Sequence, residues 1–128
     1  GGTRGGATST LVVSPGADLA VDLVWRGLVA MSVRYKTSVQ IIGPQGTPVA
    51  QHDSEPAGWT RPTTSWLPGE VIVDRHVLTV PPDLAPGAYG LAVVVYDAAS
   101  GERLALAGGP AAPMDALVLA GLEVASGP

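Results

Sequence analysis

The fold of this chain is decided by residues 86–96, which read Pro-Gly-Ala-Tyr-Gly-Leu-Ala-Val-Val-Val-Tyr. Proline fixes φ at the second position of a β-turn, and glycine takes the positive φ of the third, so Pro86-Gly87 predicts a type II turn. The run that follows would be apolar on both faces of an extended chain, which is typical of a central strand. We therefore expect a turn followed by a buried strand.

Two further Pro-Gly pairs lead into apolar runs in the same way. Pro15-Gly16 precedes ADLAVDLVW (17–25), and Pro68-Gly69 precedes EVIVDRHVLTV (70–80). In the first run apolar residues alternate with Asp and Ala, as in a half-buried antiparallel strand. Three turn-and-strand signals in one short chain predict an all-β protein.

Shorter runs complete the predicted organisation. We expect strands at residues 9–13, 35–42, 48–52, 104–107 and 116–124. Turns are expected at 43–46 and 96–102, with Gly101 left-handed, a helical turn at 28–33, and a long ordered loop at 54–67. About eight strands favour an antiparallel two-sheet β-sandwich, immunoglobulin-like or jelly-roll-like, as a single domain over residues 8–125 after a linker at 1–7. The expected core includes Val21, Leu23, Trp25, Leu78, Leu91, Val93, Val95 and Leu119.

Composition, charge and the absence of known motifs argue against several classes of function. The net charge is −4 with only seven basic residues, which argues against nucleic-acid binding. There is no basic amphipathic pattern and no apolar run of about 18 residues, so we expect no direct membrane insertion by this domain. Cysteine is absent, which removes disulfides and thiolate chemistry. No phosphate-binding, dinucleotide, zinc-protease or nucleophile-elbow motif occurs, and we expect no cofactor, no metal and no catalysis.

Three groups of polar residues could form a catalytic or metal site, and simpler structural roles are the alternatives. Asp74 and His76 could be combined with Ser54 or Ser65 into a triad, but we interpret Asp74-Arg75-His76 as a solvated or paired strand face. Zinc would need His52 and His76 together with an aspartate. Asp53 and Glu55 could bind calcium, whereas the favoured interpretation is that Asp53 and Ser54 cap a turn.

The loop at 54–67 holds the best candidate ligand site. Trp59, Arg61 and Trp66 lie within eight residues and follow His52 and Asp53. Exposed aromatic rings and planar hydrogen-bonding groups are what a sugar requires. The favoured alternative is that Trp66 anchors the loop by burial while Trp59 stays exposed as the better stacking group.

Several short segments together resemble a known domain type. They are 14–16, 24–26, 51–56, 61–66, 68–70, 74–76, 86–89 and 96–104. In combination they resemble the extracytoplasmic C-terminal β-sandwich domain of bacterial multi-spanning membrane proteins that look like mannosyltransferase-type glycosyltransferases. The resemblance covers about residues 14–124 and departs from the family pattern at 38–42.

The resemblance implies a role outside the membrane. It implies a non-catalytic accessory domain, periplasmic or at the cell surface, tethered through a membrane-embedded parent chain and contacting glycan or lipid-linked sugar. The alternative is a purely structural or protein-interaction module without a small-molecule ligand.

Overall fold

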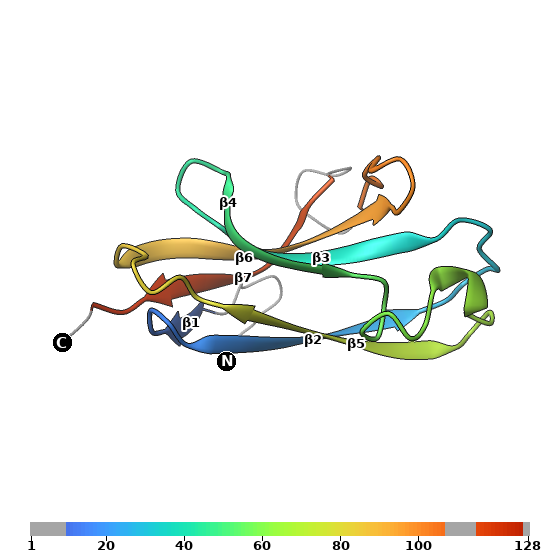
Figure 1. Ribbon diagram of the computed structural model, residues 1–128, viewed down its shortest axis with the longest axis horizontal. Helices are drawn as coiled ribbons and strands as arrows, with labels where there is room; N and C mark the ends of the chain where they lie inside the picture. The colour runs from blue at the N-terminus through green and yellow to red at the C-terminus, as the bar shows by residue number, and fades with distance from the viewer. Residues whose placement is uncertain (1–9, 107–114, 127–128) are drawn as a thin grey trace, which may run out of the picture.

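The computed structural model describes residues 10–106 and 115–126, which form two facing β-sheets (Figure 1). The strands are β1 (Thr10–Val13), β2 (Asp18–Arg26), β3 (Tyr35–Ile42), β4 (Pro48–Ser54), β5 (Val71–Thr79), β6 (Gly87–Asp97) and β7 (Leu117–Val124). One sheet has the order β1-β7-β6-β3-β4, and the other contains β2 and β5. The all-β, two-sheet prediction is confirmed, with β6 at the centre of the larger sheet.

Two of the three Pro-Gly pairs form the predicted turns. Gly16 and Gly69 have φ of 83° and 85°, and Ala17 N and Glu70 N donate to the carbonyls three residues earlier. Gly87 differs, because with φ of 140° it begins β6 rather than a type II turn. The chain instead turns earlier, where Leu84 N donates to Pro81 O at 3.2 Å.

Other connections agree with the sequence in part. The 43–46 hairpin forms, and Gly101 is left-handed with φ of 77°. Residues 104–106 do not form the expected strand. Leu104 N bonds Val95 O, but the pairing consists of isolated bridges, one of them between Tyr96 and Arg103, rather than a continuous ladder. Residues 28–33 are irregular rather than helical. Ser9 and Ala107 lie outside the described residues.

The pairing is antiparallel in four of five ladders. The exception is β1, which runs parallel to β7 at the edge of the larger sheet. A parallel neighbour needs a long connection, and β1 and β7 are far apart in the sequence. The sequence runs alone carried no signal for this pairing.

The core lies between the two sheets and largely matches the expected set. Leu23, Leu78, Leu91, Val93 and Val95 are buried, whereas Val21 and Trp25 are half-buried. Leu119 was predicted wrongly: it is 36% exposed, while Ala120, Leu122 and Val124 face the core. A register shift between Leu91 and Ala92 in the β6–β7 ladder changes which β7 residues point inward.

Candidate functional site

The loop between β4 and β5 closes one end of the two sheets. It contains a short 3-10 helix, η1 (Thr63–Ser65), and lies over the end of β2 and the start of β5 (Figure 1). Trp66 is only 7% exposed, and its Nε1 donates to Arg61 O at 3.0 Å. The predicted burial of Trp66 is therefore confirmed.

Hydrogen bonds join this loop to the segment that connects β2 and β3. Thr63 Oγ1 donates to Val33 O at 2.6 Å and accepts from Tyr35 N at 3.1 Å. Gly27 N donates to Glu70 O at 2.9 Å, and Gly69 N donates to Gly27 O at 2.6 Å. The two connections therefore form one framework at this end of the molecule.

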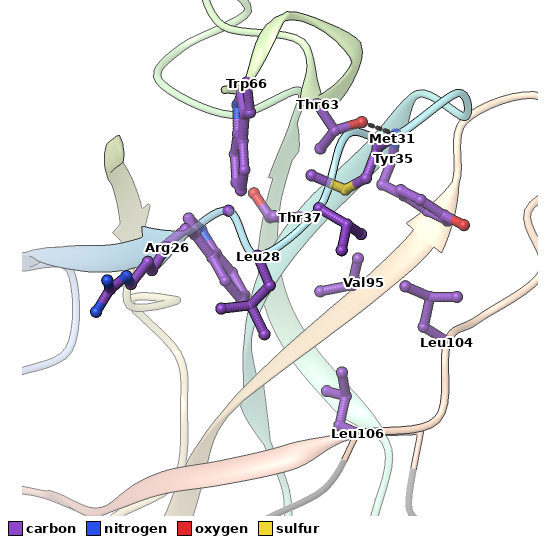
Figure 2. Close-up of a pocket in the computed structure, with 13 residues that line it drawn as sticks. Arg26, Leu28, Met31, Tyr35, Thr37, Thr63, Trp66, Val95, Leu104 and Leu106 are labelled. Atoms are coloured by element: carbon purple, nitrogen blue, oxygen red, sulfur yellow. Dashed lines mark hydrogen bonds between the residues drawn. The ribbon is translucent and has the colours of Figure 1, made fainter. Parts of the chain in front are cut away.

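A pocket of about 290 Å³ lies inside that framework, between the two sheets (Figure 2). Apolar and aromatic groups dominate its lining: Trp25, Leu28, Val29, Met31, Tyr35, Trp66, Val95, Leu104 and Leu106 contribute, together with Arg26, Gly27, Thr37 and Thr63. Figure 2 shows Val95 and Thr37 within the ring of lining groups, whereas the Arg26 guanidinium extends away from it. Apolar pockets with a few polar groups are the usual form of a small-molecule site.

The rim of the pocket exposes apolar side chains to solvent. Leu28 is 78% exposed and Val29 is also exposed, both on the irregular segment after β2. Exposed apolar side chains that lie together on a surface are unfavourable in water. Such groups often mark a site that a ligand or a partner covers. No sequence motif indicates this site, because the lining residues are scattered from Trp25 to Leu106. The unexplained apolar pair Leu28-Val29 was the one signal available.

Thr37, on the pocket lining, connects to a buried polar network around Asp74. The Asp74 side chain is fully buried on β5. Its Oδ2 accepts from Thr37 Oγ1 at 2.6 Å, Trp25 Nε1 at 3.1 Å and His76 Nε2 at 3.1 Å. Its Oδ1 accepts from Ala57 N at 2.9 Å. The carboxylate thereby ties strands of both sheets to the β4–β5 loop.

These hydrogen bonds stabilise the charged form of Asp74. Burial alone raises the pKa of the Asp74 carboxyl, but bonds from His76, Thr37, the Ala57 amide and Trp25 outweigh it and lower the pKa from 3.8 to about 2. Ala57 has a left-handed φ of 56°, which aims its N–H at the carboxylate. The strained turn and the buried charge therefore support each other.

The two histidines meet beside this carboxylate. His52 Nδ1 and His76 Nδ1 are 2.8 Å apart, and the rings are perpendicular. His76 Nδ1 also lies 3.1 Å from His52 O, and its Nε2 lies 2.9 Å from Thr37 Oγ1. Only one proton fits between the two facing Nδ1 atoms. The two rings are therefore joined by a single hydrogen bond, which links His52 to the network around Asp74.

The interpretation of Asp74-Arg75-His76 as a solvated or paired strand face holds for the pairing, since His76 lies 3.1 Å from Asp74, but not for the solvation. Arg75 does lie on an exposed face, bound to Asp22 at 2.8 and 3.0 Å, but Asp74 and His76 point into the core and are not solvated. The signal was present in the sequence. Leu78 was expected to be buried, and residues two and four positions before it in a strand must share its face.

The remaining candidate residues on β4 project to opposite sides of their sheet. His52 faces the core and His76, whereas Asp53 accepts from Ser38 at 2.6 Å and from Tyr96 at 2.7 Å on the other face. Burial raises the pKa of Asp53, but hydrogen bonds from Ser38, Tyr96 and Gln51 and the Lys36 charge lower it overall. Burial and the Asp53 carboxylate raise the pKa of Tyr96 to about 12.

The carboxylate oxygens of Asp53 and Glu55, which were considered for a turn cap and for calcium binding, already accept other hydrogen bonds. Asp53 bonds across the sheet rather than capping a turn. Glu55 is buried and accepts two hydrogen bonds from the Arg34 guanidinium. Within residues 10–106 and 115–126, no group of three or more His, Cys, Asp or Glu side chains is arranged to hold a metal ion.

The two remaining loop candidates are placed differently. Trp59 is 56% exposed, as expected, and Lys36 Nζ lies 4.9 Å from its ring centroid. The Arg61 guanidinium bonds Glu70 at 2.8 Å and also Ser65. The structure thus separates the five candidates: Trp66 is buried, His52 and Asp53 face opposite ways, Arg61 is paired with Glu70, and Trp59 is exposed with Lys36 over its ring.

Comparison with known proteins adds no assignment. No protein-family model matches the chain, and no curated protein matches it. In the part of the chain that the structure describes, no helix is long and apolar enough to cross a membrane.

Proposed function

We propose that this chain is a non-catalytic extracytoplasmic accessory domain of a larger membrane protein, and that it binds the apolar part of a lipid-linked sugar. The observation that carries the binding proposal is the apolar pocket beside Trp66, with exposed Leu28 at its rim. The location outside the membrane and the tether to a parent chain rest on the sequence resemblance.

The pocket and Trp59 are suited to different parts of such a ligand. The pocket volume of about 290 Å³ suits a short stretch of hydrocarbon rather than a sugar ring, because its lining supplies few hydrogen-bonding groups. Trp59 lies on the same loop as Trp66 and offers an exposed aromatic ring to a sugar. The loop is therefore proposed to contact both parts of an amphipathic molecule.

The strand pairing supports an immunoglobulin-like assignment within this proposal. β2 pairs with β5 in one sheet, while β3, β6 and β7 lie together in the other. This is the division of strands B and E from C, F and G in immunoglobulin sandwiches. Such domains commonly serve as binding modules, although fold alone does not define a function.

The absence of catalysis is supported by where the reactive groups lie. Asp74 and His76 are fully enclosed, so a substrate could not reach them without opening the core. Their hydrogen bonds are already satisfied by Thr37, Trp25, Ala57 and His52. A structural role for this network explains those contacts without a reaction.

A protein-interaction module is the alternative, and one observation favours it. The outer face of the β2–β5 sheet exposes four valines, Val24, Val71, Val73 and Val77. Val24 and Val73 are direct cross-strand neighbours. An exposed apolar group of this kind on a sheet face is typical of a contact with another protein surface.

The test is a titration of the isotope-labelled chain with octyl glucoside below its micelle-forming concentration, compared with glucose alone. We expect amide shifts at Leu28, Trp66 and Leu104 with octyl glucoside only. Leu104→Trp should fill the pocket and weaken binding by about tenfold or more. Leu11→Trp is the matched control, because Leu11 is a similarly exposed leucine on β1 that does not line the pocket.

The other outcomes distinguish the alternatives. Binding of glucose itself that is lost in Trp59→Ala would replace the apolar site by a sugar platform. No response to either compound would leave the valine surface as the better explanation.

A further inference from the structure

Strand β2 has a strand neighbour on one side only among the described residues, namely β5. Val80 N donates to Ala17 O, and Gly27 N donates to Glu70 O, so odd-numbered residues of β2 turn their main-chain groups toward β5. The N–H and C=O groups of the even-numbered residues face the other way, along an open edge: Asp18, Ala20, Asp22, Val24 and Arg26.

An apolar groove of about 540 Å³ follows this edge. Its walls come from β2 on one side and the inner face of the larger sheet on the other, and include Val21, Leu23, Trp25, Leu91, Val93, Leu117 and Leu119. The groove exists because five strands face only two. Leu119 is exposed, and Val21 and Trp25 are half-buried although they share the core face of β2.

We propose that this edge and groove bind one extended peptide segment of a partner protein, which adds to β2 as an antiparallel strand. The main-chain groups of the edge would supply hydrogen bonds, and alternate side chains of the segment would fill the groove. This inference is independent of the ligand proposed for the pocket. The groove shares Trp25 with the pocket, and the edge shares Arg26 with it.

The charges on β2 define the chemistry of the partner. Asp18 and Arg26 are exposed at the two ends of the strand, and neither forms an ion pair within the part of the chain described. Asp22, between them, is already bound by Arg75. A matching antiparallel segment carries an acidic residue opposite Arg26 and a basic residue opposite Asp18. Between these ends, apolar residues at alternate positions face the groove.

A peptide fits this space better than a second copy of the chain. The larger sheet extends past the open edge of β2. Its strand β7 lines the groove, and β1 lies beyond β7 in the strand order. A whole second domain paired through β2 would bring two such overhanging sheets against each other. One extended segment needs only the width of a strand, about 5 Å.

The test uses the labelled 128-residue chain and the peptide Glu-Val-Thr-Val-Thr-Val-Thr-Val-Lys. We expect amide shifts at the even-numbered residues of β2 and at Leu117 and Leu119. A second peptide with lysine in place of the first glutamate should bind about fivefold more weakly, because its lysine faces Arg26. The variant Arg26→Asp should reverse this preference by a similar factor. Arg103→Asp, which changes the net charge equally but lies on another strand edge, should not.

Three results would overturn the proposal. They are shifts confined to the pocket around Leu28, the same peptide preference in Arg26→Asp as in the unchanged protein, or sedimentation of the chain alone as a dimer in which the even-numbered amides of β2 are protected from exchange. The last result would assign the edge to a second copy.

Discussion

At the scale of single residues, the hydroxyl of Ser54 stands out from the network around it. Its Oγ is buried and has no hydrogen-bond partner within the described residues. An unsatisfied buried polar atom costs free energy that an apolar group of similar size avoids. We expect Ser54→Ala to raise the free energy of unfolding by about 1 kcal/mol, measured by chemical denaturation.

Ser38 provides the comparison for Ser54. It is equally buried, but its Oγ donates to Asp53 and accepts from Gln40 Nε2. Ser38→Ala should therefore lower stability by about 1 kcal/mol or more. Equal effects of the two substitutions would show that the missing partner of Ser54 has no energetic consequence.

Asp74 gives the protein a defined response to acid. Its pKa of about 2 lies below the ordinary value of 3.8, so the charged form is favoured in the folded state. The resulting stabilisation, about 2 kcal/mol, is present above pH 4 and is lost as the pH falls from about 4 to 2. Asp74→Asn removes the charge. It also replaces one carboxylate oxygen by an NH₂ group, which cannot accept the hydrogen bonds that the surrounding donors make to Asp74.

We therefore expect Asp74→Asn to be destabilised most at neutral pH, with the difference from the unchanged protein shrinking by about 2 kcal/mol between pH 4 and pH 2. Denaturation curves collected across that range measure the difference directly. A constant difference down to pH 2 would contradict the assignment of the acid response to this carboxylate.

At the scale of elements, the β4–β5 loop depends on one indole for its order. Fixing the loop costs backbone entropy at every residue, and burial of the large Trp66 side chain offsets that cost. We expect Trp66→Ala to lower the free energy of unfolding by about 3 kcal/mol. Trp59→Ala is the natural control because that ring is exposed, and its effect should stay within about 0.5 kcal/mol.

A small effect of Trp66→Ala, or one equal to that of Trp59→Ala, would mean that other contacts order the loop. The hydrogen bonds of Thr63 to Val33 and Tyr35 would then be the first to examine. The comparison is made on the whole chain by chemical denaturation followed by circular dichroism.

A strand could be predicted where its signal is local in the sequence, and not where it depends on long-range pairing. Alternation on β2 and the two-faced apolar run of β6 are local signals, and both strands formed where expected. The parallel pairing of β1 depends on contacts far apart in the sequence. The β7 register depends on a bulge at Leu119, which is skipped between the pairs Leu91–Ala120 and Ala92–Val118. Neither feature leaves a local pattern, so the exposure of Leu119 was not predicted.

The candidate site was harder to predict than the fold for a related reason. The side chains that surround the pocket come from β2, β3, β6 and three connections, and only their packing together creates it. Trp66 was correctly predicted to be buried because an indole in a long loop must compensate for entropy. The burial of Asp74 and His76 was not predicted, because polar residues are usually outside, whereas here each finds its hydrogen-bond partners in the core.

At the scale of the whole molecule, the unequal sheets should produce unequal local stability. β6 has neighbours on both sides in the middle of the five-stranded sheet, whereas β2 has one neighbour in a two-stranded sheet. Amide hydrogens exchange by local opening, and those with no acceptor exchange without it. The pattern of exchange therefore reports which main-chain groups are paired.

We expect the amides of β6 to exchange last and those of β2 to alternate along the strand. Leu19, Val21 and Leu23 face β5 and should be protected, whereas Ala20, Asp22 and Val24 face the open edge and should exchange about a hundredfold faster. Hydrogen exchange followed by NMR resolves each amide separately. Uniform protection along β2 in the protein alone would mean that its outer edge is already paired. The groove beside it would then be closed to any added strand, and the unequal strand numbers of the two sheets would not leave a free edge in solution.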